Sequence, residues 1–112
     1  MQLTQRKAGE VVIVGLEKPT FIEFFNADEF RQKLQEVVEA HDCVLLDFTN
    51  ITDISSKGLG ALISLLEQVK AKDGSFRLFN MKKKVAELFS ITKLDEIFQI
   101  YEGEEKALAA FQ

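Results

Sequence analysis

The segment Cys43–Phe48 restricts the fold of this chain more than any other feature of the sequence. Its residues, CVLLDF, are nearly all apolar, and they lack the alternation of polar and apolar side chains that marks a strand with one face in solvent. A short strand that is buried on both faces is typical of a parallel sheet covered by helices. We therefore predict an α/β fold, in which helices connect the parallel strands.

The remaining sequence alternates between strand-like and helix-like patterns. Residues 2–8 and 11–16 are predicted strands joined by a tight turn, so they should pair antiparallel. Further strands are expected at 76–79 and 97–100, and helices at 27–40, 82–90 and 104–111, with another helix running from the serines at 55–56 to a turn at Gly74. We predict a single domain over residues 1–112, with a mixed, mostly parallel β-sheet of four to five strands and about four helices packed against it.

Composition sets limits on the function. Of the 112 residues, 46% are hydrophobic and 29% are charged, which is enough for a core without metal or disulfide support. Cys43 is the single cysteine, and there is no Cys/His cluster for a metal, so we expect no metal site and no cofactor. The net charge of -4 gives no indication of a nucleic-acid partner. No apolar segment is suited to secretion or membrane insertion, and we expect a cytoplasmic protein.

The segment 53–60, DISSKGLG, stands between the apolar strand and the apolar helix. Ligands tend to bind at the carboxyl ends of parallel strands, and the amides at a helix start favour negative charge. The simplest interpretation is that Ser55 or Ser56 caps the helix, while Gly58 and Gly60 allow the helix to approach the sheet closely. The same junction is also suited to a phosphate.

Known catalytic motifs do not match this junction. It lacks the G-x-x-x-x-G-K-[ST] pattern of a phosphate-binding loop and the G-x-S-x-G pattern of serine hydrolases. The one histidine, His41, is expected in a surface turn beside Asp42. Because no nucleophile, base and orienting group can be assembled from the sequence, we predict that the protein is not an enzyme.

The stretch VLLDFTNITDISSKGLGALISLL resembles the signature of the bacterial anti-sigma-factor antagonists, the STAS-domain family. That signature is an apolar strand, Leu-Asp-Leu-Ser, a short loop, Asp-Ser-Ser-Gly-Leu-Gly and an apolar helix. Upstream, FIEFFNADEF is similar to the family's Gly-x-Leu-Asp-x-x-Asn-Ala segment. Downstream, MKKKVAELFSITKLDEIFQIYEGEEKALAAF resembles its closing segment, so the likeness covers essentially the whole chain.

The resemblance implies a regulatory cycle. In this family an anti-sigma factor, itself a serine kinase, phosphorylates a serine at the helix start, and a serine phosphatase removes the phosphate. The unphosphorylated antagonist binds the anti-sigma factor and so frees the sigma factor. Alignment on Gly58-Leu59-Gly60 places Ser56 at the phosphoacceptor position, with Ser55 as the alternative acceptor. The resemblance assigns partner binding to Glu23, Asn26, Asp47, Ser55, Lys57 and Gly58.

Three features leave alternatives open. Lys57 stands where relatives have a small residue, and it either attracts a phosphate or acidic group or points to solvent. The aromatic connection 21–25 either covers the sheet edge and the first helix or forms an apolar partner patch, and it could do both. Lys82, Lys83 and Lys84 form a solvated face or meet an acidic partner or a nucleotide phosphate. Alternative functions are a STAS subunit of a lipid-transport or stress-signalling complex and a small domain with weak nucleotide binding.

Overall fold

A computed structural model of the chain describes residues 1–111, in which seven strands and four α-helices alternate. The strands are β1 (Leu3–Ala8), β2 (Val11–Leu16), β3 (Thr20–Ile22), β4 (Cys43–Asp47), β5 (Ile51–Ile54), β6 (Ser75–Phe79) and β7 (Ile100–Tyr101). The helices are α1 (Ala27–Ala40), α2 (Ser56–Ala71), α3 (Lys83–Ile91) and α4 (Glu104–Ala109), with a short 3-10 helix, η1, at Leu94–Glu96.

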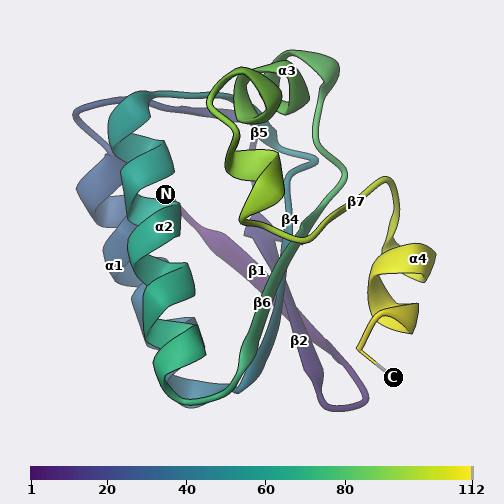
Figure 1. The fold of residues 1–112 in the computed structure, drawn as a ribbon. Helices are drawn as coiled ribbons and strands as arrows, with labels where there is room; N and C mark the ends of the chain where they lie inside the picture. The colour runs from purple at the N-terminus through teal and green to yellow at the C-terminus, as the bar shows by residue number, and fades with distance from the viewer. Residues whose placement is uncertain (112) are drawn as a thin grey trace.

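The main sheet has five strands in the order β1-β2-β4-β6-β7. The pair β1 and β2 is antiparallel, and the pairs β2–β4, β4–β6 and β6–β7 are parallel. Helices α1 and α2 lie on one face of this sheet, and α4 lies on the other (Figure 1). The prediction of a mixed, mostly parallel sheet with helices packed against it is therefore confirmed.

Strand β4 lies in the middle of the sheet and is buried on both faces. Val44 and Leu46 belong to the larger core, which lies beneath α1, α2 and α3, whereas Leu45 belongs to a smaller core beneath α4. None of these three side chains is exposed to solvent. The nearly continuous apolar sequence of this strand is thus explained, because its side chains alternate between two apolar layers.

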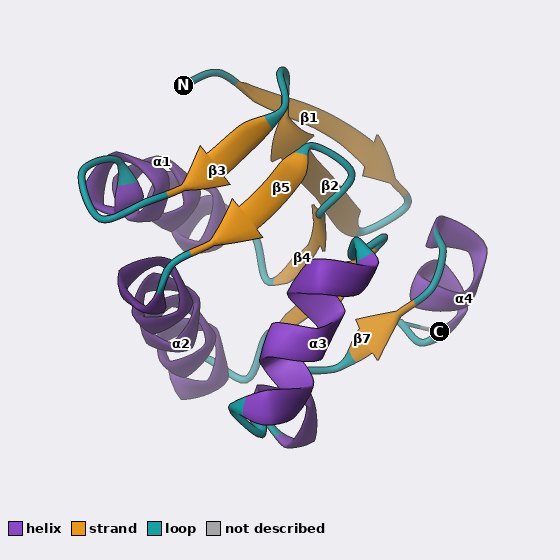
Figure 2. Ribbon diagram, turned by 90° about the horizontal axis from the view of Figure 1, so that it is seen from above, coloured by secondary structure: helices purple, strands orange, loops and turns teal. Residues whose placement is uncertain are grey.

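The sequence did not indicate the second, two-stranded sheet, in which β3 and β5 pair in parallel. It lies across the end of the main sheet, beside the starts of α1 and α2 (Figure 2). Ile22, Ile51 and Ile54 point inward and are buried. Strands of three and four residues carry too short a pattern to be recognised, and this pair forms only between segments about thirty residues apart. As a consequence, the junction 53–60 begins in β5 and does not follow directly on β4.

The prediction of a strand at 97–100 is wrong. The amides of Ile97 and Phe98 donate to the carbonyl of Leu94, at 3.1 and 2.9 Å, so they are not available for a strand ladder. The ring of Phe98 packs edge-on against Phe76 and Phe89, with centroids 6.4 and 5.9 Å apart. Only β7, two residues long, then pairs with β6.

Candidate functional site

Helices α1 and α2 begin side by side, at the end of the main sheet where the two-stranded sheet lies (Figure 2). Strand β3 leads into α1 through residues 23–26, and β5 leads directly into α2 at Ser55. The amide of Ser55 donates to the carbonyl of Ile22 at 2.7 Å, which fixes the two connecting segments relative to each other. The residues around these helix starts form the candidate site.

The two serines at the start of α2 have different surroundings. Ser55 is the N-cap, and its Oγ accepts a hydrogen bond from the amide of Gly58 at 3.2 Å. Ser56 is the first residue of the helix, and it is exposed. Of the two capping serines that the sequence allowed, Ser55 therefore caps the helix. The hydroxyl of Ser56 lies at the surface, where another protein can reach it.

The two glycines also differ. Gly58 is buried, and a Cβ atom there would lie 2.6 Å from Cγ1 of Ile54 and 2.8 Å from Cγ2 of Ile22. The first turn of α2 thus lies so close to the two-stranded sheet that only glycine fits. Gly60 is exposed, and a Cβ there would meet nothing within 4 Å. The expectation that both glycines permit close packing holds for Gly58 and is wrong for Gly60.

Lys57 links the two helix starts. Its Nζ lies 3.2 Å from Oδ2 of Asp28 in the first turn of α1, and 4.2 Å from the ring centroid of Phe24. The Lys57 side chain is 35% exposed. The sequence-based alternatives were a lysine that points to solvent and one that attracts a phosphate or a partner's acidic group, and neither described this contact within the chain. An exposed ion pair and a cation–π contact thus orient the ammonium, and each is a weak interaction in water.

The aromatic connection presents its rings to solvent. Phe24 is 74% exposed and Phe25 is 78% exposed, whereas Phe21 is 41% exposed. The expectation that these rings cover the sheet edge and the first helix is therefore wrong for Phe24 and Phe25. Ile22, which directly follows Phe21 in the sequence, is the side chain that enters the core. We refer to Phe24 and Phe25 as the aromatic ridge.

Asn26 fixes the shape of the turn that carries the aromatic ridge. Its Oδ1 accepts a hydrogen bond from the amide of Glu23 at 2.7 Å, and its Nδ2 donates to the carbonyl of Phe21 at 3.0 Å. Asn26 occupies the N-cap position of α1, but its side chain bonds back to the loop and not to the helix. The role of the side chain is thus to close residues 21–26 into a rigid turn.

Asp47 belongs to a separate polar cluster. Its Oδ1 accepts hydrogen bonds from the amide and the hydroxyl of Thr49, at 2.9 and 2.6 Å, and Nδ2 of Asn80 lies 3.4 Å away. These contacts shape the turn between β4 and β5, which then positions Ser55 and Ser56. The other predicted partner-binding residues lie together around the starts of α1 and α2, and they are Glu23, Asn26, Ser55, Lys57 and Gly58. Asp47 lies apart from them, at the end of β4. Its direct role in binding stays a prediction.

An ion pair joins α3 to β5 just before the two serines. Nζ of Lys84 lies 2.7 Å from Oδ2 of Asp53, whose side chain is 22% exposed. The hydrogen bond from Lys84 lowers the pKa of the Asp53 carboxyl, and partial burial opposes this effect. The sequence left open whether Lys82, Lys83 and Lys84 form a solvated face or meet an acidic partner or a nucleotide phosphate. Lys84 instead pairs with a carboxylate of the same chain, which sequence spacing could not reveal.

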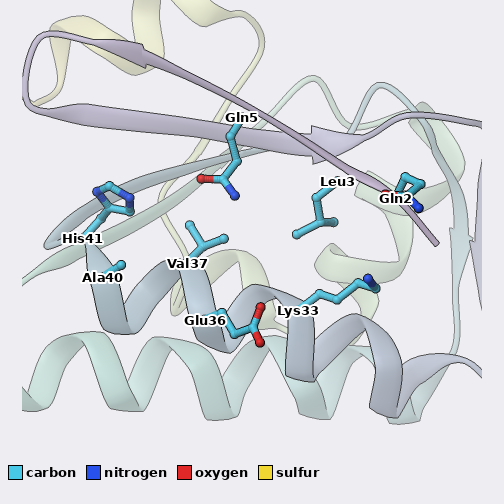
Figure 3. A pocket seen from close by; sticks show the side chains of 8 residues that line it. All are labelled: Gln2, Leu3, Gln5, Lys33, Glu36, Val37, Ala40 and His41. Atoms are coloured by element: carbon cyan, nitrogen blue, oxygen red, sulfur yellow. The ribbon is translucent and has the colours of Figure 1, made fainter.

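Among residues 1–111, the cavity lining does not bring together a catalytic or metal-binding group of side chains. One of about 290 Å³ lies between β1 and α1 and is lined by mixed side chains, including Gln5, Lys33, Glu36 and His41 (Figure 3). Residues 1–111 contain no group of three or more His, Cys, Asp or Glu side chains placed to hold a metal ion. In the same range, no helix has the length and apolar character needed to cross a membrane. The site around Ser56 therefore consists of an exposed serine beside exposed aromatic side chains at the starts of two helices.

A model of the STAS domain matches residues 2–107, and the chain belongs to the STAS domain family. It is 32% identical over 85 residues to a candidate anti-sigma factor antagonist of Thermotoga neapolitana, covering 76% of this chain and 70% of that protein. The anti-sigma-B factor antagonist of Bacillus subtilis is 29% identical over 79 residues, 70% of this chain and 72% of its own. The crystal structure of a candidate anti-sigma factor antagonist from Thermotoga maritima has the same fold, with a TM-score of 0.86 and 24% identity, covering 96% of this chain and 92% of the other.

Proposed function

We propose that this protein is an anti-sigma-factor antagonist whose binding is switched by phosphorylation of Ser56. The observation that carries this proposal is the division of roles between the two serines. Ser55 supplies the cap that α2 needs, and Ser56 presents its hydroxyl at the surface. Relatives named as anti-sigma factor antagonists support the same function. The protein acts in the cytoplasm, where sigma factors and RNA polymerase work.

The cycle follows from the chemistry of the hydroxyl. The anti-sigma factor, a serine kinase, transfers the γ-phosphoryl group of ATP to Oγ of Ser56, and ADP and the hydroxyl proton leave. A serine phosphatase hydrolyses the ester and restores the hydroxyl. The chain is therefore a kinase substrate and not a catalyst. The unphosphorylated form binds the anti-sigma factor and so releases the sigma factor.

The physical basis of the switch is a local change of charge at an interface. A phosphate adds about -1.5 to -2 charges, which the amides and the dipole at the start of α2 tolerate in the free protein. A partner surface that fits the bare hydroxyl would have to desolvate these charges and accommodate three additional oxygens. A cost of ~1.4 kcal/mol already lowers affinity tenfold. The fold thus stays intact while binding weakens.

The surrounding residues give this interface its shape. Asn26 holds the turn that carries Glu23, Gly58 lets α2 approach the two-stranded sheet, and Lys57 connects α2 with α1. We propose that the anti-sigma factor contacts Glu23, Ser55 and Lys57 around Ser56. Asp47 acts indirectly, because it shapes the turn before β5.

The proposal is tested with each serine-kinase anti-sigma factor encoded in the source genome, purified and incubated with this protein and ATP. Mass spectrometry should locate one phosphate on Ser56. Ser56→Ala should abolish phosphorylation, whereas the matched variant Ser55→Ala should retain it despite a weaker helix cap. Binding of the same kinase should weaken at least about tenfold on phosphorylation. Phosphorylation of Ser56→Ala, or equal binding by both forms, would contradict the proposal.

A further inference from the structure

We propose that Lys57 and Phe24 form a phosphate-responsive clamp, which presents Phe24 to an apolar pocket of the anti-sigma factor only while Ser56 carries no phosphate. This inference rests on the proposed function and adds to it a specific anchor and a way of releasing that anchor. The contacts that carry it are those of the Lys57 ammonium, 4.2 Å from the Phe24 ring centroid and 3.2 Å from Asp28.

The Phe24 ring leaves most of its apolar surface in solvent, where a partner protein can bury it. Phe24 and Phe25 are 74% and 78% exposed, and Asn26 holds their turn rigid through two side-chain hydrogen bonds. The ammonium above the ring further restricts the Phe24 side chain. A rigid, protruding ring loses little conformational freedom when it enters a pocket, as is typical of interface anchors.

The clamp adjoins the phosphorylation site directly. Lys57 follows Ser56 in the first turn of α2, and its ammonium lies above the Phe24 ring. The aromatic ridge is thus linked to the acceptor residue through the neighbouring lysine. A kinase that binds Ser56 can contact the ridge within the same interface.

The charges around the ridge favour a protein as the occupant. The carboxylates of Asp28 and Glu29, which are 65% and 48% exposed, lie in the first turn of α1 behind the ridge, and Glu23 precedes it. Each of these two carboxylates is paired, Asp28 with Lys57 and Glu29 with the N-terminal amine, so little uncompensated charge adjoins the aromatic ridge. An apolar pocket on the anti-sigma factor, the protein that must also cover Ser56, accepts the ring without burying an unpaired charge.

Phosphorylation would draw Lys57 away from the ring. The ammonium is held by one largely exposed carboxylate and one exposed ring, both of which are weak partners in water. A phosphate on the neighbouring residue carries more charge and three acceptor oxygens, so it competes well for the same cation. Once Lys57 turns to the phosphate, the Phe24 ring is no longer fixed, and binding must order it again.

The clamp is tested by NMR in the free protein, with phosphoserine introduced at position 56 during translation so that no kinase is required. Without phosphate, the ring current of Phe24 should shift the Lys57 ε-methylene protons upfield, and Phe24→Leu should remove this shift. With phosphoserine, the shift should disappear, while the Lys84 ε-methylene beside Asp53 should keep its position. A shift that persists with phosphoserine, or one that does not depend on Phe24, would overturn the clamp.

The anchor is tested by calorimetric titration of the unphosphorylated protein with the anti-sigma factor that phosphorylates it. Phe24→Ala should weaken binding about tenfold or more without lowering the melting temperature. The matched variant Ile91→Ala, which removes a 79% exposed side chain on α3, should bind like the wild type. Equal binding by Phe24→Ala would overturn the anchor. A wild type that binds no anti-sigma factor would contradict the proposed function, and the NMR comparison would still decide the clamp.

Discussion

Gly58 and Gly60 both lie near the start of α2, but the space available for a side chain differs between the two positions. A side chain at position 58 would collide with Ile22 and Ile54, whereas a side chain at 60 would project into open space. Helix propensity disfavours glycine at both positions by a similar amount. Gly58 is therefore explained by packing within the chain, and Gly60 is not.

Replacing each glycine by alanine should separate these effects. Gly60→Ala should raise the free energy of unfolding by about 0.5–1 kcal/mol, because alanine favours the helix and meets no neighbour. Gly58→Ala should lower it by about 1–2 kcal/mol, since the added methyl group displaces two packed isoleucines. Urea denaturation of both variants beside the wild type gives the comparison. A Gly58→Ala protein as stable as Gly60→Ala would show that the packing is looser than described.

The sequence located the serine pair but could not divide its roles from physics alone. Which serine caps α2 depends on where β5 ends, and that is decided by pairing with β3 far upstream in the chain. Family resemblance placed the acceptor at Ser56, and the structure gives that serine the exposed position. The contact of Lys57 with Phe24 joins residues from separate elements, so no local pattern could predict it.

Among the elements, those with long apolar patterns were predicted well and those held by distant partners were not. Strands β2 and β4 and helix α1 match their predicted positions to within a residue, because each has enough apolar residues to define its period. The pair β3–β5 and the 3-10 helix η1 were missed, since each is specified by a few hydrogen bonds and not by periodicity. The two-stranded sheet matters for function because it delivers both helix starts to the site.

The ion pair between Lys84 and Asp53 fastens α3 to this sheet and should make stability depend on acid pH. Because the pKa of Asp53 is lower in the folded protein than in the unfolded chain, its contribution is fully present above about pH 4 and declines as the pH falls further. Lys84 is largely exposed, so the contribution should not exceed about 1 kcal/mol.

Asp53→Asn is the variant that isolates this effect. Urea denaturation at pH 7 should show a slightly less stable variant than the wild type, and the two proteins should converge as the pH falls below about 4 and Asp53 is protonated. The amide side chain retains an oxygen for the hydrogen bond from the amide of Ile54, so the local turn is preserved. A difference that stayed constant over this pH range would exclude the ion pair as its cause.

At the scale of the whole molecule, the two faces of the main sheet have different tasks. Helices α1 and α2 cover one face and carry the candidate site at their starts, whereas α4 lies on the opposite face (Figure 1). Beneath α4, the side chains of Val11, Ile13, Leu45 and Phe79 form the smaller core. Arg77 stacks on the ring of Phe111, at 4.5 Å from the guanidinium carbon to the centroid, and Arg6 pairs with Glu104.

This division predicts that α4 stabilises the fold without taking part in the switch. A chain that ends at Glu102 loses the apolar contacts of Ala107, Leu108 and Phe111 and should be less stable by about 3 kcal/mol. Its bared apolar face should also cause self-association, which light scattering after size-exclusion chromatography would detect. Glu104→Gln, which removes only the exposed pair with Arg6, should keep the oligomeric state of the wild type with a nearly unchanged melting temperature.

Phosphorylation assays on the chain that ends at Glu102 and on Glu104→Gln test whether the start of α2 depends on the opposite face of the main sheet. At a temperature where the shortened chain is still folded, the kinase of the proposed cycle should modify Ser56 equally in both proteins and in the wild type, because α4 lies on the other side of the sheet from α2 (Figure 1). Far-ultraviolet circular dichroism establishes that the shortened chain is folded at the assay temperature. A folded, shortened chain that the kinase no longer recognises would show that the smaller core beneath α4 also shapes the start of α2.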